Sequence, residues 1–356
     1  MGKTQLKFAV ILGFAGLISC SAQNVGPAKF AHNVCRHVSI LDDVTLKPVL
    51  GAEDLALDEA NGRLFISAYN RRAAEKASKR NGAAPPSGGV YAVPLDALFQ
   101  AGGQPVYAAS LASPGEFSGG LRPHGIHYDK TNKELVFINR TYARDGRKWR
   151  MEPVLQRLGA NGEVFVGAAQ TTHCAANDVV TNEGENLVSF DHASCGIGAG
   201  FENIFRLKRS GLMNDRSIVF KKALFANGLA QTVDGDFVLA ATRENALLVL
   251  DRNKHEIKTR IDLPGGPDNL SVSAEGDIIA AVHPKMLKLA FNRKLGWGRA
   301  PSRIIKADPQ TGAIDILFDD PKGALFSAAT SAVKVEQGLI AGSVTDEGLL
   351  VCREKS

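Results

Sequence analysis

The sequence predicts an all-β protein folded as a six-bladed β-propeller. Two observations predict this fold. One short motif recurs along the chain, and the segments between its copies are rich in Val, Ile, Leu and Phe and are broken by Gly, Asn and Asp turns. The 356 residues accommodate six copies at about 54 residues each, which is typical of four-stranded propeller blades.

Each copy of the motif begins with a polar residue or pair, followed by a short apolar stretch, a turn and a second β-like run. The copies begin at residues 53, 124, 177, 227, 268 and about 330, and the sixth is the weakest. Alternating apolar runs separated by turn residues indicate β-strands. A β-sandwich pair or a β-helix would not require copies of this length, so the propeller is the preferred architecture.

Further strands are expected between the copies, at residues 90–93, 204–207, 247–250 and 304–307. No long amphipathic helix is expected, although residues 93–100 could form one or two helical turns. The Gly-rich segment 196–200 lacks the Lys of a phosphate-binding loop, so we expect a flexible connection there. The polar segment 69–88 is either a lid over the channel mouth or an uninvolved surface excursion.

The N-terminal segment is typical of an export signal. Lys3 and Lys7 precede an apolar run at residues 8–18, and small residues follow it. This run is shorter than the roughly 20 residues of a membrane-spanning helix. Residues 17–20 resemble a bacterial lipobox, so lipidation at Cys20 and plain secretion both remain open.

We therefore expect a signal peptide at residues 1–23 and a single propeller domain at residues 24–356. The only expected membrane contact is through a lipid anchor at Cys20. In a bacterium the protein would be periplasmic or membrane-anchored, and otherwise it would be secreted.

Four cysteines follow the signal segment: Cys35, Cys174, Cys195 and Cys352. Export permits disulfides, and four cysteines allow three pairings. Because Cys35 and Cys352 lie at opposite ends of the mature chain, a bridge between them would join those ends, and we expect this pairing. Unrelated thiols are the alternative, and the pairing of Cys174 with Cys195 stays open.

The charge balance gives no indication of a nucleic-acid partner. The formal net charge is +5, which is too mild for that class, and the basic clusters lack interleaved aromatic residues. These clusters are expected to be solvated loops. They comprise Arg71, Arg72, Lys76, Lys79 and Arg80, and then Arg144, Arg147, Lys148 and Arg150.

The repeat also predicts a metal site. The innermost strand of each blade lines the central channel, so residues at one repeat position converge on the axis. Here those residues are Glu53, Asp54, His124, Asn177, Asp178, Asn227, Asp268 and Asn269. A single Asn-Gly or Asp-Asn pair among them would be interpreted as a turn, and His124 alone as a histidine packed at the start of a strand. Together they form an oxygen-rich set without a thiolate, which matches Ca²⁺ and predicts a central calcium-binding channel.

Several blocks of the sequence resemble the paraoxonase/arylesterase family in order, spacing and residue type. They cover nearly the whole mature chain at residues 51–55, 123–126, 177–178, 191–192, 225–228, 268–272 and 283–284, with Cys35 and Cys352 outside them. Gluconolactonase-like and strictosidine-synthase-like propellers share the architecture with weaker motif agreement.

This resemblance implies a calcium-dependent lactonase or arylesterase with two ions in the channel. The ligands of the catalytic ion would be Glu53, Asn177, Asn227, Asp268 and Asn269. The ligands of a deeper structural ion would be Asp54, Asp178 and the backbone carbonyl of Ile126. Calcium would polarise the substrate carbonyl, and His124 would activate water as general base.

One residue departs from the family pattern. Arg140 stands where the family has a second histidine, and a permanent cation cannot relay a proton. If close, it would lower the pKa of His124, and it could bind an acidic substrate. A carboxylate at the metal, His192 or His283 could replace the missing histidine.

Two functions therefore remain open. The first is calcium-dependent hydrolysis of a small lactone or aryl ester. The alternative is a non-catalytic, calcium-stabilised propeller that binds a ligand or partner.

Overall fold

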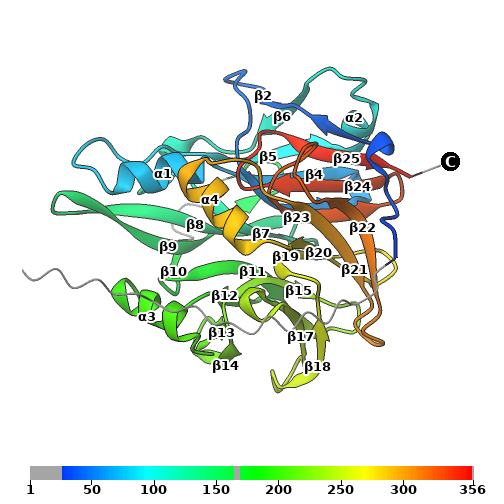
Figure 1. Cartoon of the computed structure of the whole chain (residues 1–356). Coiled ribbons are helices and arrows are strands. Elements are labelled where there is room, and N and C mark those ends of the chain that lie inside the picture. Colours follow the sequence, from blue (N-terminus) through cyan, green and yellow to red (C-terminus); the bar gives the residue numbers. More distant parts are fainter. Residues whose placement is uncertain (1–25, 164–168, 355–356) are drawn as a thin grey trace, which may run out of the picture.

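Each copy of the sequence motif forms the innermost strand of its own β-sheet in the computed structural model, which describes residues 26–163 and 169–354. These strands are β3 (Ala52–Asp58), β7 (Pro123–Asp129), β11 (Ala176–Asn182), β15 (Ala226–Gln231), β19 (Gly266–Val272) and β23 (Ala329–Val335). The six sheets surround a common axis (Figure 1). The prediction of a six-bladed β-propeller is confirmed, whereas the predicted signal segment 1–23 with Cys20 lies outside the described residues.

The strands of the first three blades follow chain order from the channel outward, except that β2 forms the outer edge of the first blade. The first blade has five strands, β3, β4 (Arg63–Ala68), β5 (Gly89–Pro94), β6 (Val106–Ser110) and β2 (Ile40–Asp42). The second has β7, β8 (Glu134–Asp145), β9 (Lys148–Gly159) and β10 (Gln170–Thr171). The third has β11, β12 (Glu185–Phe190), β13 (Ser210–Asn214) and β14 (Ile218–Ala223).

The other three blades have four strands each. The fourth contains β15, β16 (Phe237–Ala241), β17 (Ala246–Leu250) and β18 (Ile257–Asp262). The fifth contains β19, β20 (Ile278–His283), β21 (Ser302–Ala307) and β22 (Ile314–Asp320). The sixth contains β23, β24 (Gly338–Ser343), β25 (Leu349–Arg353) and, from the other end of the chain, β1 (Cys35–Val38).

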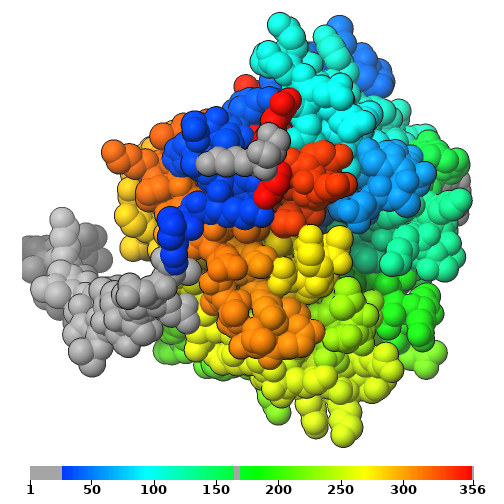
Figure 2. Space-filling model, turned by 90° about the vertical axis from the view of Figure 1, so that its right-hand side faces the viewer, coloured from blue at the N-terminus to red at the C-terminus, as the bar shows by residue number. Residues whose placement is uncertain are grey.

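The ring is closed by strands from opposite ends of the sequence. Strand β1 pairs antiparallel with β25, which places Cys35 directly opposite Cys352, and the two form a disulfide. Figure 2 looks onto one face of the ring, where the colours follow the chain from blue and cyan at the top through green and yellow-green to orange. The expected Cys35–Cys352 pairing is confirmed, and Cys174 is bonded to Cys195.

The apolar core is divided among the interfaces between neighbouring blades. Val180 and Leu239, for example, belong to one buried cluster between the third and fourth blades. Because each sheet is covered on both faces, a middle strand such as β17 is buried along its whole length. This explains why residues 247–250 are continuously apolar rather than alternating.

In the described residues, four α-helices interrupt the strands: α1 (Arg71–Ser78), α2 (Leu95–Gln100), α3 (Ile197–Phe205) and α4 (Met286–Leu295). Short 3-10 helices occur at η1 (His32–Val34), η2 (Glu59–Asn61), η3 (Pro114–Glu116) and η4 (Thr242–Glu244). The expected helical turn within 93–100 is α2. None of the helices in the described part of the chain is long and apolar enough to cross a membrane.

Two expectations near residue 200 are wrong. Residues 196–200 do not form a flexible connection, because α3 begins at Ile197, and the strand expected at 204–207 is instead the end of that helix. Ile197, Phe201 and Phe205 are spaced four residues apart and therefore share one helix face. All three are exposed, so the apolar content that suggested a buried strand belongs to a surface helix.

Candidate functional site

The six inner strands share one irregularity near their first residues. The pairing register of each inner strand with its neighbour shifts at the same place, between residues 52 and 54, 123 and 126, 176 and 179, 226 and 229, 267 and 270, and 329 and 331. A bulge re-aims side chains and is often found beside active sites. We call the end of the channel where the inner strands begin the upstream end, and the other the downstream end.

The bulges carry two successive rings of residues at the upstream end. The first ring consists of Glu53, His124, Asn177, Asn227, Asp268 and Thr330. The second ring consists of the residues that follow them, Asp54, Gly125, Asp178, Gly228, Asn269 and Ser331. Sequence reasoning named most of these residues but missed Thr330, whose repeat position was the signal that could have found it.

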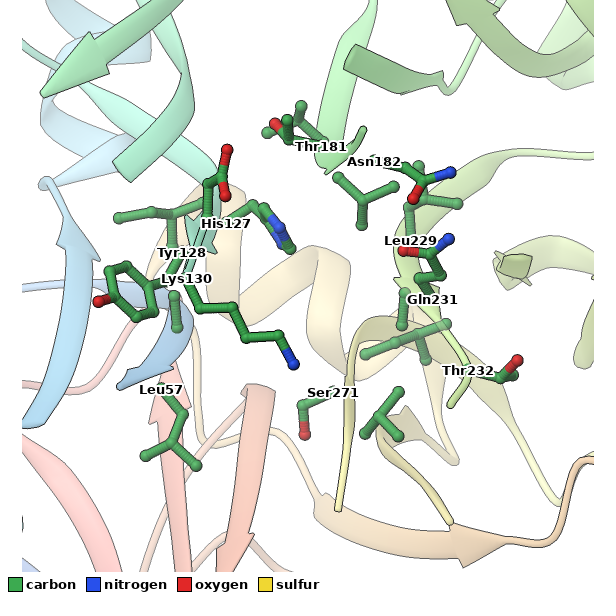
Figure 3. Close-up of a pocket in the computed structure, with 18 of the residues that line it drawn as sticks. Leu57, His127, Tyr128, Lys130, Thr181, Asn182, Leu229, Gln231, Thr232 and Ser271 are labelled. Atoms are coloured by element: carbon green, nitrogen blue, oxygen red, sulfur yellow. The ribbon is translucent and has the colours of Figure 1, made fainter. Parts of the chain in front are cut away.

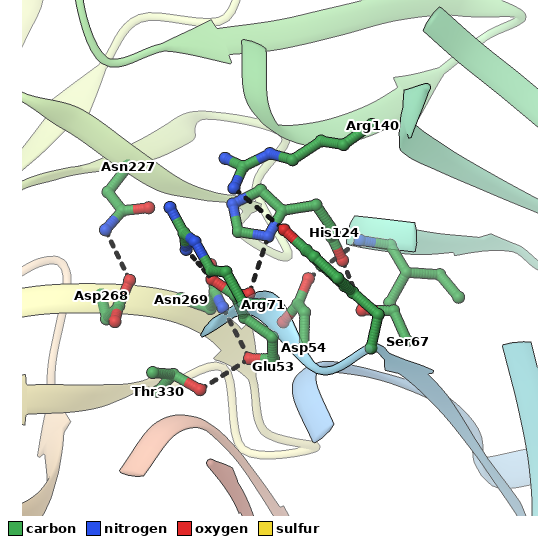
Figure 4. Close-up of polar contacts among 12 residues, drawn as sticks. Glu53, Asp54, Ser67, Arg71, His124, Arg140, Asn227, Asp268, Asn269 and Thr330 are labelled. Atoms are coloured by element: carbon green, nitrogen blue, oxygen red, sulfur yellow. Dashed lines mark hydrogen bonds and ion pairs between the residues drawn. The ribbon is translucent and has the colours of Figure 1, made fainter. Parts of the chain in front are cut away.

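Glu53 is the most densely contacted member of the first ring (Figure 4). Its Oε1 lies 2.6 Å from Nη1 of Arg71, and its Oε2 lies 3.1 Å from Nδ1 of His124. Its backbone carbonyl accepts hydrogen bonds from Asn269 at 2.9 Å and from Thr330 at 2.8 Å. Burial opposes ionisation, but the charges of Arg71 and the neighbouring groups lower the pKa of Glu53 well below its ordinary value.

A second polar group joins the fourth and fifth blades. Asn227 Nδ2 donates to Asp268 Oδ1 at 2.5 Å, and His283 Nε2 lies 2.7 Å from Asp268 Oδ2. The structure therefore places His283 beside a predicted metal ligand. It does not bring His192 into this group, because that ring lies between Asp191 and Asn203, each at 2.5 Å.

The second ring alternates aspartate with glycine around the first four blades. Asp54 accepts backbone N–H groups from Leu55 and Ile126, and Asp178 accepts them from Val179 and Leu229. Ile126 thus contacts Asp54 through its N–H.

Glycine is required between these carboxylates. A Cβ at Gly125 would overlap Asp178, and one at Gly228 would overlap the backbone of Asp268 and Asn269. Burial, and for Asp54 also the charge of Asp178, raises the pKa of both aspartates, that of Asp178 to about 7.

Several buried polar atoms of the first ring have no hydrogen-bond partner. They are Asn177 Oδ1, His124 Nε2 and Nδ1 of the adjoining His283, whereas Glu53 Oε2 and His124 Nδ1 face each other at 3.1 Å without the alignment of a hydrogen bond. Unpaired buried polar atoms are rare and indicate an unseen ion, water or ligand. In residues 26–163 and 169–354 no group of three or more His, Cys, Asp and Glu side chains is arranged to hold a metal, so a cation here would depend on asparagine oxygens, as Ca²⁺ sites often do.

Arg140 enters the site from β8, with its guanidinium beside the ring of His124 (Figure 4). Its Nη1 lies 3.3 Å from the hydroxyl of Tyr69. Burial, followed by the charge of Arg140, lowers the pKa of His124 to about 4. Arg140 therefore lies close to His124, and both burial and this charge favour the neutral imidazole near pH 7.

The segment 69–88 does reach over the site. Helix α1 begins there with Asn70 as its N-cap, and Arg71 points inward to Glu53 and, at 3.1 Å, to Glu75. The interpretation of this basic cluster as solvated is therefore wrong for Arg71, whose side chain is 16% exposed. Arg72 anchors the helix by donating to the backbone carbonyls of Asn292 and Arg293 in α4.

The downstream end contains a cavity of about 980 Å³. Its wall includes Leu57, His127, Lys130, Asn182 and Gln231 (Figure 3). Asp54, Ile126 and Asp178 line the same cavity, so the second ring separates it from the first.

A scan of the sequence against models of known protein families gives no match. A search of curated proteins gives no relative either. Solved structures do match. A candidate gluconolactonase aligns with a TM-score of 0.51 at 15% identity, over 92% of this chain and 94% of its own. This match supports the six-bladed propeller fold.

Two further structures align over most of the chain. A gluconolactonase from Xanthomonas campestris has a TM-score of 0.47 and 15% identity, over 93% of this chain and 99% of its own. A luciferin-regenerating enzyme has a TM-score of 0.49 and 12% identity, over 87% of this chain and 93% of its own.

Proposed function

We propose that the protein is a calcium-dependent hydrolase that cleaves lactones or aryl esters at the upstream end of its channel. The observation that carries the proposal is the set of buried, unpaired polar atoms around a neutral histidine, above all Asn177 Oδ1 and His124 Nε2. The motif blocks that resemble the paraoxonase/arylesterase family support it. The gluconolactonase fold match adds a lactone hydrolase of the same architecture.

The first ring would hold the catalytic ion. Its ligands would be Glu53, Asn177, Asn227 and Asp268, together with Asn269 of the second ring, and their carboxylate and amide oxygens suit Ca²⁺. A bound Ca²⁺ would polarise the carbonyl of the substrate and stabilise the negative charge that develops on its oxygen. A deeper structural ion would lie with Asp54 and Asp178, and the carbonyl of Ile126 stays a prediction.

His124 would move the proton. Nε2 of its neutral ring has no hydrogen-bond partner, and Oε2 of Glu53 lies 3.1 Å from Nδ1. The ring accepts a proton from water while the water oxygen bonds to the acyl carbon. The acyl C–O bond then breaks, and His124 returns the proton to the departing oxygen. A lactone thus gives one hydroxy acid, and an aryl ester gives an acid and a phenol.

Two features of the site favour the alternative function, a non-catalytic propeller that binds a ligand. Arg71 neutralises one oxygen of Glu53, and Arg140 replaces the second histidine expected from the resemblance. The first leaves Glu53 with less negative charge for a metal ion, and the second leaves His124 without a histidine partner. Neither change removes the two rings of polar residues.

Hydrolysis assays distinguish the two functions. We would assay aliphatic lactones and phenyl acetate with calcium and after EGTA, using the unmodified protein, Asn227→Ala and His124→Ala. For a hydrolase, turnover requires calcium and Asn227, and His124→Ala abolishes turnover while calorimetry still detects calcium binding. Calcium binding by the unmodified protein without turnover would favour the ligand-binding propeller.

The proposed compartment is outside the cytoplasm. The two disulfides are consistent with an extracellular or periplasmic protein. Whether Cys20 carries a lipid is a separate proposal, which mass spectrometry of the membrane-associated protein tests.

A further inference from the structure

We propose that the upstream site selects substrates that carry a carboxylate beside the reacting ester, and that Arg140 binds this carboxylate. The inference rests on the proposed hydrolase function and names the substrate class of the same site. It depends on three features of Arg140: its burial, its lack of a carboxylate partner, and its place beside His124.

Arg140 is a buried cation without a counter-ion. Its side chain is 4% exposed, and its Nε has no hydrogen-bond partner. Across residues 26–163 and 169–354, no carboxylate lies within ion-pair distance of it. A guanidinium stays protonated, and burying a charge without a partner is unfavourable. A ligand that brings an anionic group would supply the missing partner.

A second buried arginine shows what a structural role looks like in this fold. Arg122 is 1% exposed, and its guanidinium donates to the backbone carbonyls of Pro85, Pro86 and Gly119. It thereby holds the segment 69–88 against the second blade. Arg140 makes no such contacts, since its hydrogen bond is to the hydroxyl of Tyr69. Packing therefore does not account for the charge of Arg140.

The ion pairs beside Arg140 leave this arginine without an ion-pair partner of its own. Arg71 lies 2.6 Å from Glu53 and 3.1 Å from Glu75, and Arg293 lies 3.9 Å from Glu75. Two carboxylates thus pair with two guanidiniums, and they reach the charge of Arg140 only at longer range. Because Arg140 lies beside His124 (Figure 4), an anion held by it would sit next to the proposed reaction centre.

The geometry points to a small lactone or ester with a separate carboxylate. A guanidinium binds a carboxylate through two parallel hydrogen bonds, which orients the ligand as well as attracting it. The ester of the same molecule would then face His124. Hydrolysis of such a lactone adds one water and yields a hydroxy acid with two carboxylates, of which Arg140 holds the one that does not react.

Two matched probes test the inference. For turnover, we would compare 5-oxotetrahydrofuran-2-carboxylate with γ-valerolactone, in which a methyl group replaces the carboxylate. For binding, we would titrate glutarate and neutral glutaramide into the protein by calorimetry, a readout that needs no catalysis. The variants are Arg140→Met, Arg140→Lys and, as control, Arg144→Met, which removes an exposed arginine from the same strand.

The expected result is a preference for the charged member of each pair that Arg140→Met removes. We expect glutarate affinity to fall roughly tenfold to a hundredfold, as for the loss of a charge-assisted hydrogen bond, and Arg144→Met to leave it unchanged. If Arg140→Met does not fold, Arg140→Lys decides, because it keeps the charge but loses the two-pronged contact and should weaken glutarate binding.

The inference and the proposed function can fail separately. Equal turnover of both lactones, unchanged in preference by Arg140→Met, would overturn the inference and leave the hydrolase intact. Arg140-dependent glutarate binding without turnover of any lactone would support the carboxylate subsite and contradict the proposed hydrolase function. If neither glutarate nor glutaramide binds, and no preference exists in turnover, the carboxylate subsite is wrong.

Discussion

The two ends of the channel are built from the same six strands and differ in almost every other respect. At the upstream end, Glu53 and His124 are buried beneath α1. Glu53 carries a charge that Arg71 pairs, and Nε2 of His124 has no hydrogen-bond partner. At the downstream end, residues such as Asn182 and Gln231 line a cavity of about 980 Å³.

The difference begins at the bulges, which occur only a residue or two into each inner strand. Polar side chains upstream are thereby directed at one another, and several of their atoms have no hydrogen-bond partner within the protein. Downstream, the same strands are regularly paired and their polar residues face an open space. Buried polar groups that lack partners are costly, so the upstream end is where a ligand can contribute most.

The largest effect should separate two asparagines on one strand. Asn177 and Asn182 are the upstream and downstream asparagines of β11. Replacing Asn177 by Ala removes a buried, unpaired oxygen of the proposed calcium site, and we expect turnover and calcium affinity to fall at least about a hundredfold. Asn182→Ala should leave both unchanged. Equal losses in the two variants would contradict the assignment of the site to the upstream end.

A smaller effect should follow from removing the cation that covers Glu53. Arg71→Met leaves a buried carboxylate without its partner. We expect the free energy of unfolding in EGTA to fall by about 2 kcal/mol, because Arg71 is partly exposed. Calcium should restore much of this loss by supplying the positive charge that Glu53 needs.

Denaturant titrations with and without calcium measure the loss. Arg72→Met is the control, since that arginine contacts backbone carbonyls of α4 instead of Glu53. A loss of stability in Arg71→Met that calcium does not alter would argue against Glu53 as a metal ligand.

A third change probes the close approach of the second ring. Gly125→Ala places a Cβ against Asp178, and overpacking of this kind costs about 1 to 2 kcal/mol of unfolding free energy. Gly200→Ala, in the exposed part of α3 where nothing lies within 4 Å of the added atom, should stabilise the helix by roughly 0.5–1 kcal/mol. Thermal denaturation of both variants checks the opposite signs.

The smallest effect is expected in the downstream cavity. Lys130 lines this cavity and is exposed. Lys130→Met should change stability by less than about 0.5 kcal/mol and should leave turnover unchanged. A clear loss of turnover would mean that the substrate uses the downstream end, and the distinction drawn between the two ends would have to be abandoned.

The inner strands were predictable because their signal is repeated. One Asn-Gly or Asp-Asn pair says little, but the recurrence at residues 53, 124, 177, 227 and 268 fixed the blade spacing, and even the weak sixth copy begins β23. Residues at equivalent positions of the repeats also lie close together around the propeller axis, although they are far apart in the sequence. Hence Glu53, His124 and Asp268 could be expected near one axis before any contact was known.

Helices α1 and α3 were less predictable from the sequence, because each occurs in one blade and is not repeated in the others. Arg71 lies in a basic cluster typical of a solvated loop, and only the fold of α1 turns it toward Glu53. Helix α3 was missed because its exposed Phe201 and Ile204 resemble the apolar residues of a strand. The direction of a lone side chain depends on tertiary placement, which a repeat does not encode.

The pairing of β1 with β25 has a consequence for synthesis. Because the sixth blade takes one strand from residues 35–38 and three from beyond residue 328, the circle cannot be completed until nearly the entire polypeptide has left the ribosome. During elongation β1 lacks its partner, which keeps the chain from locking early into its final form. The disulfide between Cys35 and Cys352 can form only after both strands are present, and it then links the two ends of the ring covalently.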